Sequence, residues 1–133
     1  MILDTQYLGS LVEQLPNARA KAAALDDRDV PIRVPSAVVW EIYYGIGKTP
    51  ETKRITLQRA YKRLLRAFPV VDLDDDLGRR AGVLRGKHAD SDRLKNLDGA
   101  DSIVAATALA KGEPVVSNDE DFQDVEGLIV ETY

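Results

Sequence analysis

"DGADSIVAATALAKGEPVVSND", residues 98–119, is the stretch of sequence that decides the fold class. Asp commonly caps helix N-termini and Gly commonly follows helix C-termini. We therefore predict a helix between Asp98 and Gly112. This helix is apolar on nearly every side from Ile103 to Ala110, which is typical of a buried helix. The apolar residues of "PVVSND" indicate a short strand after it. A buried helix leading into a buried strand indicates an α/β fold.

The rest of the chain continues this alternation of short apolar runs and longer helical patterns. The expected strands are residues 1–3, 30–35, 68–74, 114–119 and 128–133. The expected helices are residues 5–15, 16–27, 36–45, 51–68, 74–92 and 98–112. Ser36 is the expected N-cap of the third helix, and the two glycines and the proline of "GIGKTP" are expected to end it. We therefore expect residues 1–133 to form one domain, a three-layer α/β/α fold around a mostly parallel sheet.

Charge is distributed unevenly along the 133 residues, whose net charge is −4. Residues 48–95 contain 13 Lys and Arg against 7 Asp and Glu, whereas residues 96–133 contain one base and nine acids. A polyanion could bind the basic middle while the acids hold cations, or both could be solvated faces. The chain has no Cys, which excludes disulfides and thiolate metal sites and fits a reducing cytosol. No apolar run reaches the roughly 18 residues of a membrane span, so we expect a cytoplasmic protein with no membrane partner.

Four acidic residues stand out because each lies at the carboxyl end of an expected strand or on the helix that follows one. They are Asp4, Glu41, Asp101 and Asp119. In open parallel sheets, ligands bind beyond the carboxyl ends of the strands, where residues distant in sequence converge. We therefore expect these four carboxylates to share one site.

Glu41 is the most informative of the four, because it lies in "SAVVWEIYYG" with no broad polar face around it. Its neighbours four residues away on either side are Ala37 and Gly45, both small. A buried carboxylate without a partner is costly, so it must be paired, protonated or bound to a metal. The alternative to a metal is a salt bridge to Arg33 or Arg54.

The other three acids each have an ordinary conformational explanation. Asp101 suits the third position of a helix capped by Asp98, where an acid interacts favourably with the helix dipole. Asp4 could be the N-cap of the helix that follows it. Asp119 lies in the turn "SNDEDF", where Asn and Asp are common. None of the three is specific alone, so the prediction depends on their joint placement.

Convergence of four ionised carboxylates requires a compensating charge. Six like-charged pairs at about 5 to 6 Å cost roughly 3 kcal/mol each at an effective dielectric near 20, or about 18 kcal/mol in total. That exceeds the roughly 5 to 15 kcal/mol of net stability of a typical domain. Oxygen ligands without His or Cys suit a hard cation, so we expect Mg²⁺ or Mn²⁺ rather than zinc. The single histidine, His88, lies among polar residues and is expected at the surface, not at the metal.

Four segments together resemble the PIN domains, and within them the VapC-type toxin ribonucleases of prokaryotic toxin–antitoxin pairs. They are "ILDTQYL", "PSAVVWEIYYG", "DGADSIVAATALAKG" and "VVSNDEDF", and the resemblance extends from Asp4 to Phe122. It implies a sheet of strand order 3-2-1-4-5 and an Mg²⁺- or Mn²⁺-dependent endoribonuclease that leaves 5′-phosphate and 3′-hydroxyl ends. It also implies two partners besides RNA: a second copy of the chain, forming a homodimer, and a small antitoxin whose tail blocks the site.

The resemblance also assigns roles by motif position. The acids that would hold the metal are Asp4, Glu41, Asp101 and Asp119. Ser117 falls where a hydroxyl helps to order the site, and Thr5 would fix the turn after the first acid. Gln6 departs from the small residue that is frequent at its position. Asp121 lies where relatives carry His or Asp, and we interpret it as a helix cap.

The basic helix at 51–68 has two possible roles. Its bases could hold the RNA backbone, or the helix could be a dimer or antitoxin interface. The candidate RNA-binding residues are Lys53, Arg54, Arg59, Lys62 and Arg63.

Three other functions fit the sequence less well. A phosphatase with Asp4 as nucleophile usually needs an acid two residues later, where this chain has Gln6. A receiver-like switch would need paired acids after its first strand and a later Lys at a strand end, and the sequence has neither. A non-catalytic PIN-like interaction module is the remaining alternative, and the presence of all four acids argues against it.

Overall fold

The computed structural model describes residues 1–133, and its helices and strands alternate as expected. The helices are α1 (Thr5–Val12), α2 (Pro16–Arg28), α3 (Ser36–Lys48), α4 (Glu51–Leu65), α5 (Asp75–Ala89) and α6 (Gly99–Lys111). The strands are β1 (Ile2–Leu3), β2 (Val34–Pro35), β3 (Val70–Val71), β4 (Val115–Val116) and β5 (Val130–Glu131), and a 3-10 helix, η1, spans Glu120–Phe122. The α/β class is therefore confirmed, with strands shorter than the segments predicted from the sequence.

All strand pairs of the sheet are parallel. Strand β4 lies between β1 and β5, and β2 pairs with β3. A single parallel bridge between Ile2 and Arg33 joins these two groups, so β1 lies next to the start of β2. The pairings agree with the expected order 3-2-1-4-5, except that one bridge replaces a full ladder between β1 and β2. The residues of β1 and β4 are buried, as expected for strands covered on both faces.

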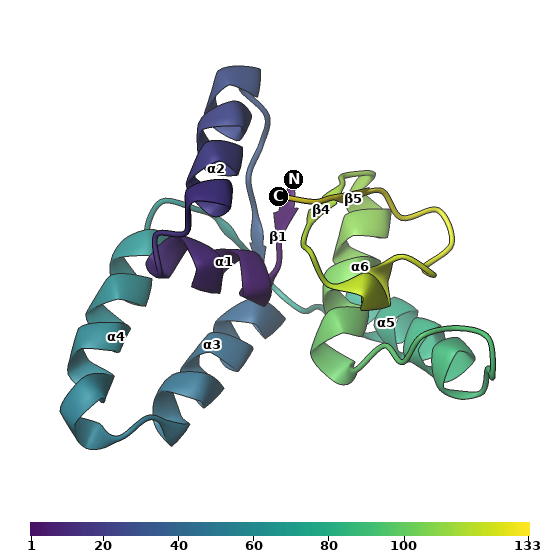
Figure 1. Cartoon of the computed structure of the whole chain (residues 1–133). Coiled ribbons are helices and arrows are strands. Elements are labelled where there is room, and N and C mark those ends of the chain that lie inside the picture. The colour runs from purple at the N-terminus through teal and green to yellow at the C-terminus, as the bar shows by residue number, and fades with distance from the viewer.

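Helices cover the sheet on two sides. Helices α1 to α4 lie on one side of β1, at the left of Figure 1, and α5 and α6 lie on the other. Helix α6 contacts β1, β2 and β4, and α5 packs against α6. Val104, Ala105 and Ala108 of α6 belong to the buried core, and the small Ala side chains let this helix lie close to the strands. None of the helices is both long and apolar enough to cross a membrane.

Both ends of α6 agree with the prediction from the sequence. Asp98 is the N-cap, and its Oδ1 accepts a hydrogen bond from the Asp101 backbone N–H at 2.8 Å. Gly112 follows the last helical residue with a φ of 63°, in the left-handed region that glycine adopts without a steric penalty. These caps fix where the helix begins, and therefore where its first acidic side chain lies.

Helix α3 differs from the prediction at its N-terminus and, in part, at its C-terminus. Pro35 occupies the N-cap position, so the prediction of Ser36 as N-cap is wrong. The Ser36 hydroxyl instead accepts a hydrogen bond from the Leu73 backbone N–H at 3.1 Å. The helix also continues through both glycines of "GIGKTP", neither of which adopts a positive φ. It ends at the predicted proline, because Pro50 disfavours a helical conformation for Thr49, whose ψ is 142°.

His88 is buried, with 4% of its surface exposed, so the prediction of a surface histidine is wrong. It lies near the end of α5, and its Nδ1 is 3.0 Å from the Lys95 carbonyl oxygen. The Lys95 backbone N–H in turn donates to the Asp124 carboxylate at 3.0 Å. The segment between α5 and α6 therefore folds back over His88, a tertiary contact that its polar sequence neighbours do not reveal.

Candidate active site

Asp4 follows β1 directly, so its carboxylate lies at the carboxyl end of a central strand, and the residue is 3% exposed. Its Oδ1 accepts a hydrogen bond from the Thr5 backbone N–H at 2.7 Å, which makes Asp4 the N-cap of α1. Its Oδ2 accepts one from the Ser117 hydroxyl at 2.8 Å. Ser117 follows β4, the parallel neighbour of β1, so strand pairing brings the two side chains together. The capping role and a place in the site are therefore compatible.

Glu41 reaches the same region from α3. Its Oε1 accepts a hydrogen bond from the Thr5 hydroxyl at 2.7 Å. No arginine binds it, because Arg33 pairs with Glu113 at 2.8 Å and Arg54 donates to backbone carbonyls near the end of α3. The alternative of a salt bridge to Arg33 or Arg54 is therefore wrong.

Asp101 lies in the first turn of α6 and is 8% exposed. Only its backbone N–H takes part in the cap, as the donor to Asp98. Its carboxylate accepts no hydrogen bond, although that of Asp98 accepts one. A capping interaction therefore does not account for the Asp101 carboxylate, and a buried carboxylate in this state favours a bound proton or a cation.

Asp119 is the N-cap of η1, and its Oδ1 accepts a hydrogen bond from the Asp121 backbone N–H at 2.9 Å. The Asp119 backbone N–H donates to the Ser117 hydroxyl oxygen at 3.0 Å. Ser117 thus connects the segment of the fourth acid to Asp4. Asp121 lies inside η1, so the prediction of Asp121 as a helix cap is wrong and Asp119 has that role.

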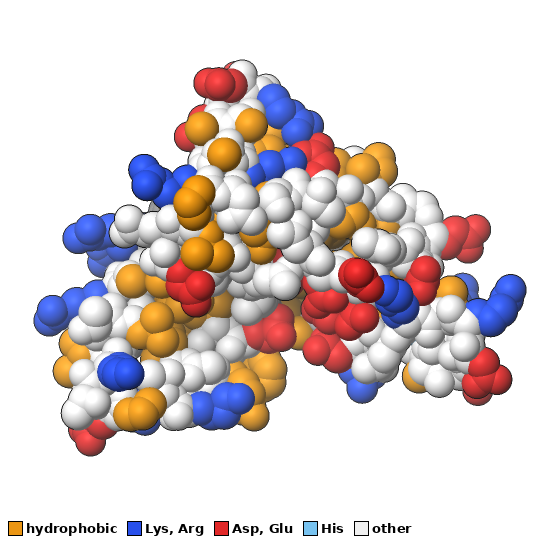
Figure 2. All heavy atoms as spheres, in the orientation of Figure 1, with side chains coloured by type: hydrophobic (Ala, Val, Ile, Leu, Met, Phe, Trp, Pro, Cys, Tyr) orange, Lys and Arg blue, Asp and Glu red, His pale blue; other side chains and the backbone are white.

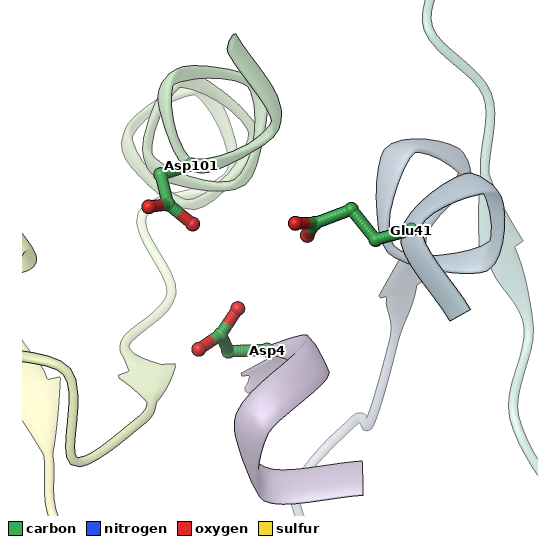
Figure 3. Close-up of side chains that lie close together, drawn as sticks. All are labelled: Asp4, Glu41 and Asp101. Carbon is green, nitrogen blue, oxygen red and sulfur yellow. The ribbon is translucent and has the colours of Figure 1, made fainter. Parts of the chain in front are cut away.

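The structure brings the acidic residues together in two overlapping groups. Carboxylate oxygens of Asp4, Glu41 and Asp101 lie within 4.8 Å of one another. Figure 3 shows the three side chains pointing into a common space from the start of α1, from α3 and from α6. A second group with the same 4.8 Å limit contains Asp101, Asp119 and Asp121. Asp101 belongs to both groups, so Asp119 joins the other predicted acids through it, and Asp121 is a member that the sequence interpretation missed.

The donor atoms of these groups suit a hard divalent cation. All are carboxylate oxygens, without His or Cys, and two of the residues are buried. None of the ion pairs in the structure includes Asp4, Glu41 or Asp101. A divalent cation would be held by these three residues, and Asp119 and Asp121 lie close to Asp101.

Burial and mutual repulsion weaken the acidity of the group. Burial, with added repulsion from Asp98 and Asp4, raises the pKa of Asp101 to about 8. Burial raises the pKa of Asp4 to about 6, although the hydrogen bond from Ser117 opposes the rise. Burial also raises the pKa of Glu41. Without a cation, the group therefore retains a proton at pH 7, and cation binding displaces it.

The bases of α4 lie away from this acidic cluster. Lys53, Arg59, Lys62 and Arg63 are exposed, whereas Arg54 is half-buried and bonded to carbonyls of the α3–α4 turn. Figure 1 places α4 at the outer edge of the molecule, with α1 and α3 between it and α6. The structure therefore does not bring the five candidate RNA-binding residues together with the four acids.

Comparisons with known proteins identify the family and the fold. The family model that matches is the PIN domain, over residues 1–128, whereas a comparison with curated proteins finds no match. VapBC2 from Rickettsia felis, bound to a DNA fragment from its promoter, has a similar structure, with a TM-score of 0.83 and 20% identity over 99% of this chain and 97% of that chain. DNA-bound VapBC from Salmonella typhimurium has a TM-score of 0.79 and 20% identity over 98% of this chain and 96% of that chain.

A third similar structure is VapBC-5 from Mycobacterium tuberculosis, with a TM-score of 0.67 and 23% identity over 98% of this chain and 94% of that chain. These likenesses show a shared fold. The family match covers nearly the whole sequence and contains the end of β1, the acid of α3 and the first turn of α6, which contribute to the candidate site. The chain belongs to the PIN domain family.

Proposed function

We propose that this protein is a metal-dependent endoribonuclease and the toxin of a VapBC-type toxin–antitoxin pair, acting as a single cytoplasmic domain. The observation that carries the proposal is the convergence of Asp4, Glu41 and Asp101 from three elements without any cationic side chain between them. Such a group is stable at neutral pH only when protons or a cation compensate its charge. The PIN fold and the VapBC neighbours support the choice of ribonuclease chemistry.

The residues of the site prepare it for the ion. Asp4, Glu41, Asp101 and Asp119 would hold Mg²⁺ or Mn²⁺ and position it without attacking the substrate. The Thr5 and Ser117 hydroxyls donate to Glu41 and Asp4, so one oxygen of each acid has a fixed direction. A bound ion lowers the pKa of water and neutralises negative charge on a phosphodiester.

The partners that we propose are RNA, a second copy of the chain and a cognate antitoxin. The titles of the similar structures name VapBC and FitAB complexes, which supports a protein partner here. A groove of about 510 Å³ between α1 and α4 is lined by apolar side chains, among them Leu11 and Leu64, and by the bases Arg59 and Arg63. This combination, distant from the acidic cluster, supports the interface role of α4 over the role of gripping RNA.

A cleavage assay tests the proposed function. Purified protein is incubated with a mixed RNA pool, with Mg²⁺ or Mn²⁺ and with EDTA. We expect wild-type cleavage to require the cation, and Asp4→Asn and Asp101→Asn to reduce it at least about 100-fold, because each removes a ligand charge. Asp27→Asn, on the exposed surface of α2, removes one charge elsewhere and serves as the matched control.

Two results would contradict the proposal. Cleavage that survives both EDTA and the two site variants would exclude the metal-held mechanism. A folded wild-type protein that binds Mn²⁺ but cleaves no RNA would instead favour the non-catalytic interaction module.

A further inference from the structure

An exposed aromatic stack lies on α3 beside the acidic cluster. The rings of Trp40 and Tyr44 have centroids 5.3 Å apart and planes inclined by 11°, so they are stacked. Lys48 extends the row, with its Nζ 4.5 Å from the Tyr44 ring centroid. The row follows one face of the helix because each member is four residues from the next. Trp40 is 64% exposed and Tyr44 55%, so this ordered stack faces solvent.

A pocket of about 330 Å³ lies at the Trp40 end of this stack. Its lining residues are Ser36, Ala37, Trp40, Leu73, Ala100 and Ile103. Tyr44 covers one face of the indole ring, and the other α3 residues of the pocket lie one turn before Trp40, on the side away from Tyr44. The pocket therefore has an aromatic wall and otherwise small or aliphatic sides, which is the environment that a flat heteroaromatic ring prefers.

The same pocket adjoins the acidic cluster on two sides. Ala37 lies one helical turn before Glu41, on the same face of α3, and Ala100 directly precedes Asp101. Figure 2 shows acidic side chains gathered between α3 and α6, with hydrophobic side chains beside them over α3. A ligand with one flat apolar part and one anionic part next to it would thus fit the pocket and the cation site together.

We propose that the Trp40 pocket binds an unpaired nucleobase of the RNA, adjacent to the phosphodiester held at the acidic cluster. The inference deepens the proposed function and rests on it. Lys48 supplies a positive charge for the backbone on the other side of the stack. A nucleobase can stack on Trp40 only where it is not enclosed in a duplex, so the substrate is single-stranded at this position.

An RNA ligand suits this surface better than a protein partner does. A protein interface core typically excludes charged residues, whereas the stack carries Lys48 at one end and has Glu41 next to Trp40. The two rings are already ordered against each other, which reduces the entropy lost when a third ring stacks on them. A contact with a second copy of the chain is the competing occupant, and the experiment separates the two.

Trp40 is the only tryptophan of the chain, so its fluorescence reports directly on the pocket. Asp101→Asn protein, used to prevent cleavage, is titrated in Mg²⁺ with a single-stranded oligoribonucleotide, with an abasic oligomer of equal length and with the RNA duplex. We expect only the single strand with bases to quench the emission. Replacing Trp40 with Ala should weaken binding of the single-stranded oligoribonucleotide about 5- to 150-fold, the usual range for one lost base stack.

Matched variants separate stacking from other effects. Trp40→Phe keeps an aromatic face and should retain most of the affinity, and Tyr43→Ala removes an α3 aromatic outside the stack and should bind like the parent. Equal binding by the Trp40→Ala variant, or equal quenching by the abasic oligomer, would overturn the inference. The inference would also be overturned if the Trp40 fluorescence changed with protein concentration and not with RNA, because that result would assign the pocket to a second copy of the chain.

The inference and the proposed function can fail separately, because binding is measured with the Asp101→Asn protein and cleavage with the wild type. Wild-type cleavage that is unchanged by Trp40→Ala would overturn the base pocket and leave the ribonuclease intact. Quenching by the single strand without any wild-type cleavage would overturn the ribonuclease and support base binding.

Discussion

Asp101 combines burial, a carboxylate without a hydrogen-bond donor and four acidic neighbours in its two overlapping groups. Its pKa of about 8 lies far above its value in an unfolded chain, so the folded state without cation binds a proton that the unfolded state releases. The stability from this group is fully present below pH 3.8 and is lost as the pH rises towards 8. The same direction holds for Asp4, whose pKa is about 6.

Replacing Asp101 with Asn tests this residue directly. In EDTA, the wild type should lose stability between pH 5 and pH 8.5, and Asp101→Asn should lose less, because its amide does not ionise. The melting temperature of the variant should exceed that of the wild type by several degrees at pH 8.5, since about 1 kcal/mol shifts a domain of this size by roughly 3 to 5 °C. Asp27→Asn should behave like the wild type, and equal losses in all three proteins would refute the account of Asp101.

Sequence reasoning selected individual acids well where their chemistry conflicted with their surroundings. Glu41 stood out because an ionised group interrupts an apolar helix, and the structure places it beside Asp4 and Asp101. Asp121 was missed because it lies in a polar turn, where the role of a helix cap explains an acidic residue without a metal. His88 was misplaced for the opposite reason, since its polar neighbours suggest exposure and only a tertiary contact with Lys95 buries it.

At the scale of the element, local signals were reliable and long-range ones were not. Asp98 caps α6 as predicted because the bond joins residues three apart in the sequence. Ser36 has the same capability, but its hydroxyl is engaged by Leu73, 37 residues away, and Pro35 takes the N-cap position. A helix end is therefore predictable where the neighbouring chain does not compete for the same polar atoms.

Two glycines of the α5–α6 pair should respond in opposite directions to the same substitution. Gly82 lies in the middle of α5, and a Cβ there would meet no atom within 4 Å, so Gly82→Ala should stabilise the protein by about 1 kcal/mol. Gly112 has a φ of +63°, where Ala is strained by about 1 to 2 kcal/mol, so Gly112→Ala should destabilise it. Thermal melts of both variants check this, and shifts of the same sign would contradict the assigned helix ends.

At the scale of the whole molecule, the sheet explains why residues distant in sequence share one site. The parallel pairing of β1 with β4 puts Asp4 next to Ser117, and the helices on either side add Glu41 and Asp101. The alternation of strands and helices predicted this layered α/β architecture, and the resemblance to PIN domains implied the strand order that the observed pairings partly show. It could not predict that the sheet narrows to one bridge between Ile2 and Arg33, since strand length depends on backbone hydrogen bonds between distant segments.

A ligand held by several elements binds only the folded chain and therefore stabilises it. The central claim is that Asp4, Glu41 and Asp101 form one cation site, and a thermal melt with Mn²⁺ tests it most directly. At about 100 times its measured Kd, Mn²⁺ should add about 2.7 kcal/mol to the free energy of unfolding of the wild type, or roughly 8 to 13 °C. Asp27→Asn should gain the same shift and Asp101→Asn almost none. Equal shifts in the wild type and in Asp101→Asn, or no shift in the wild type, would contradict the claim.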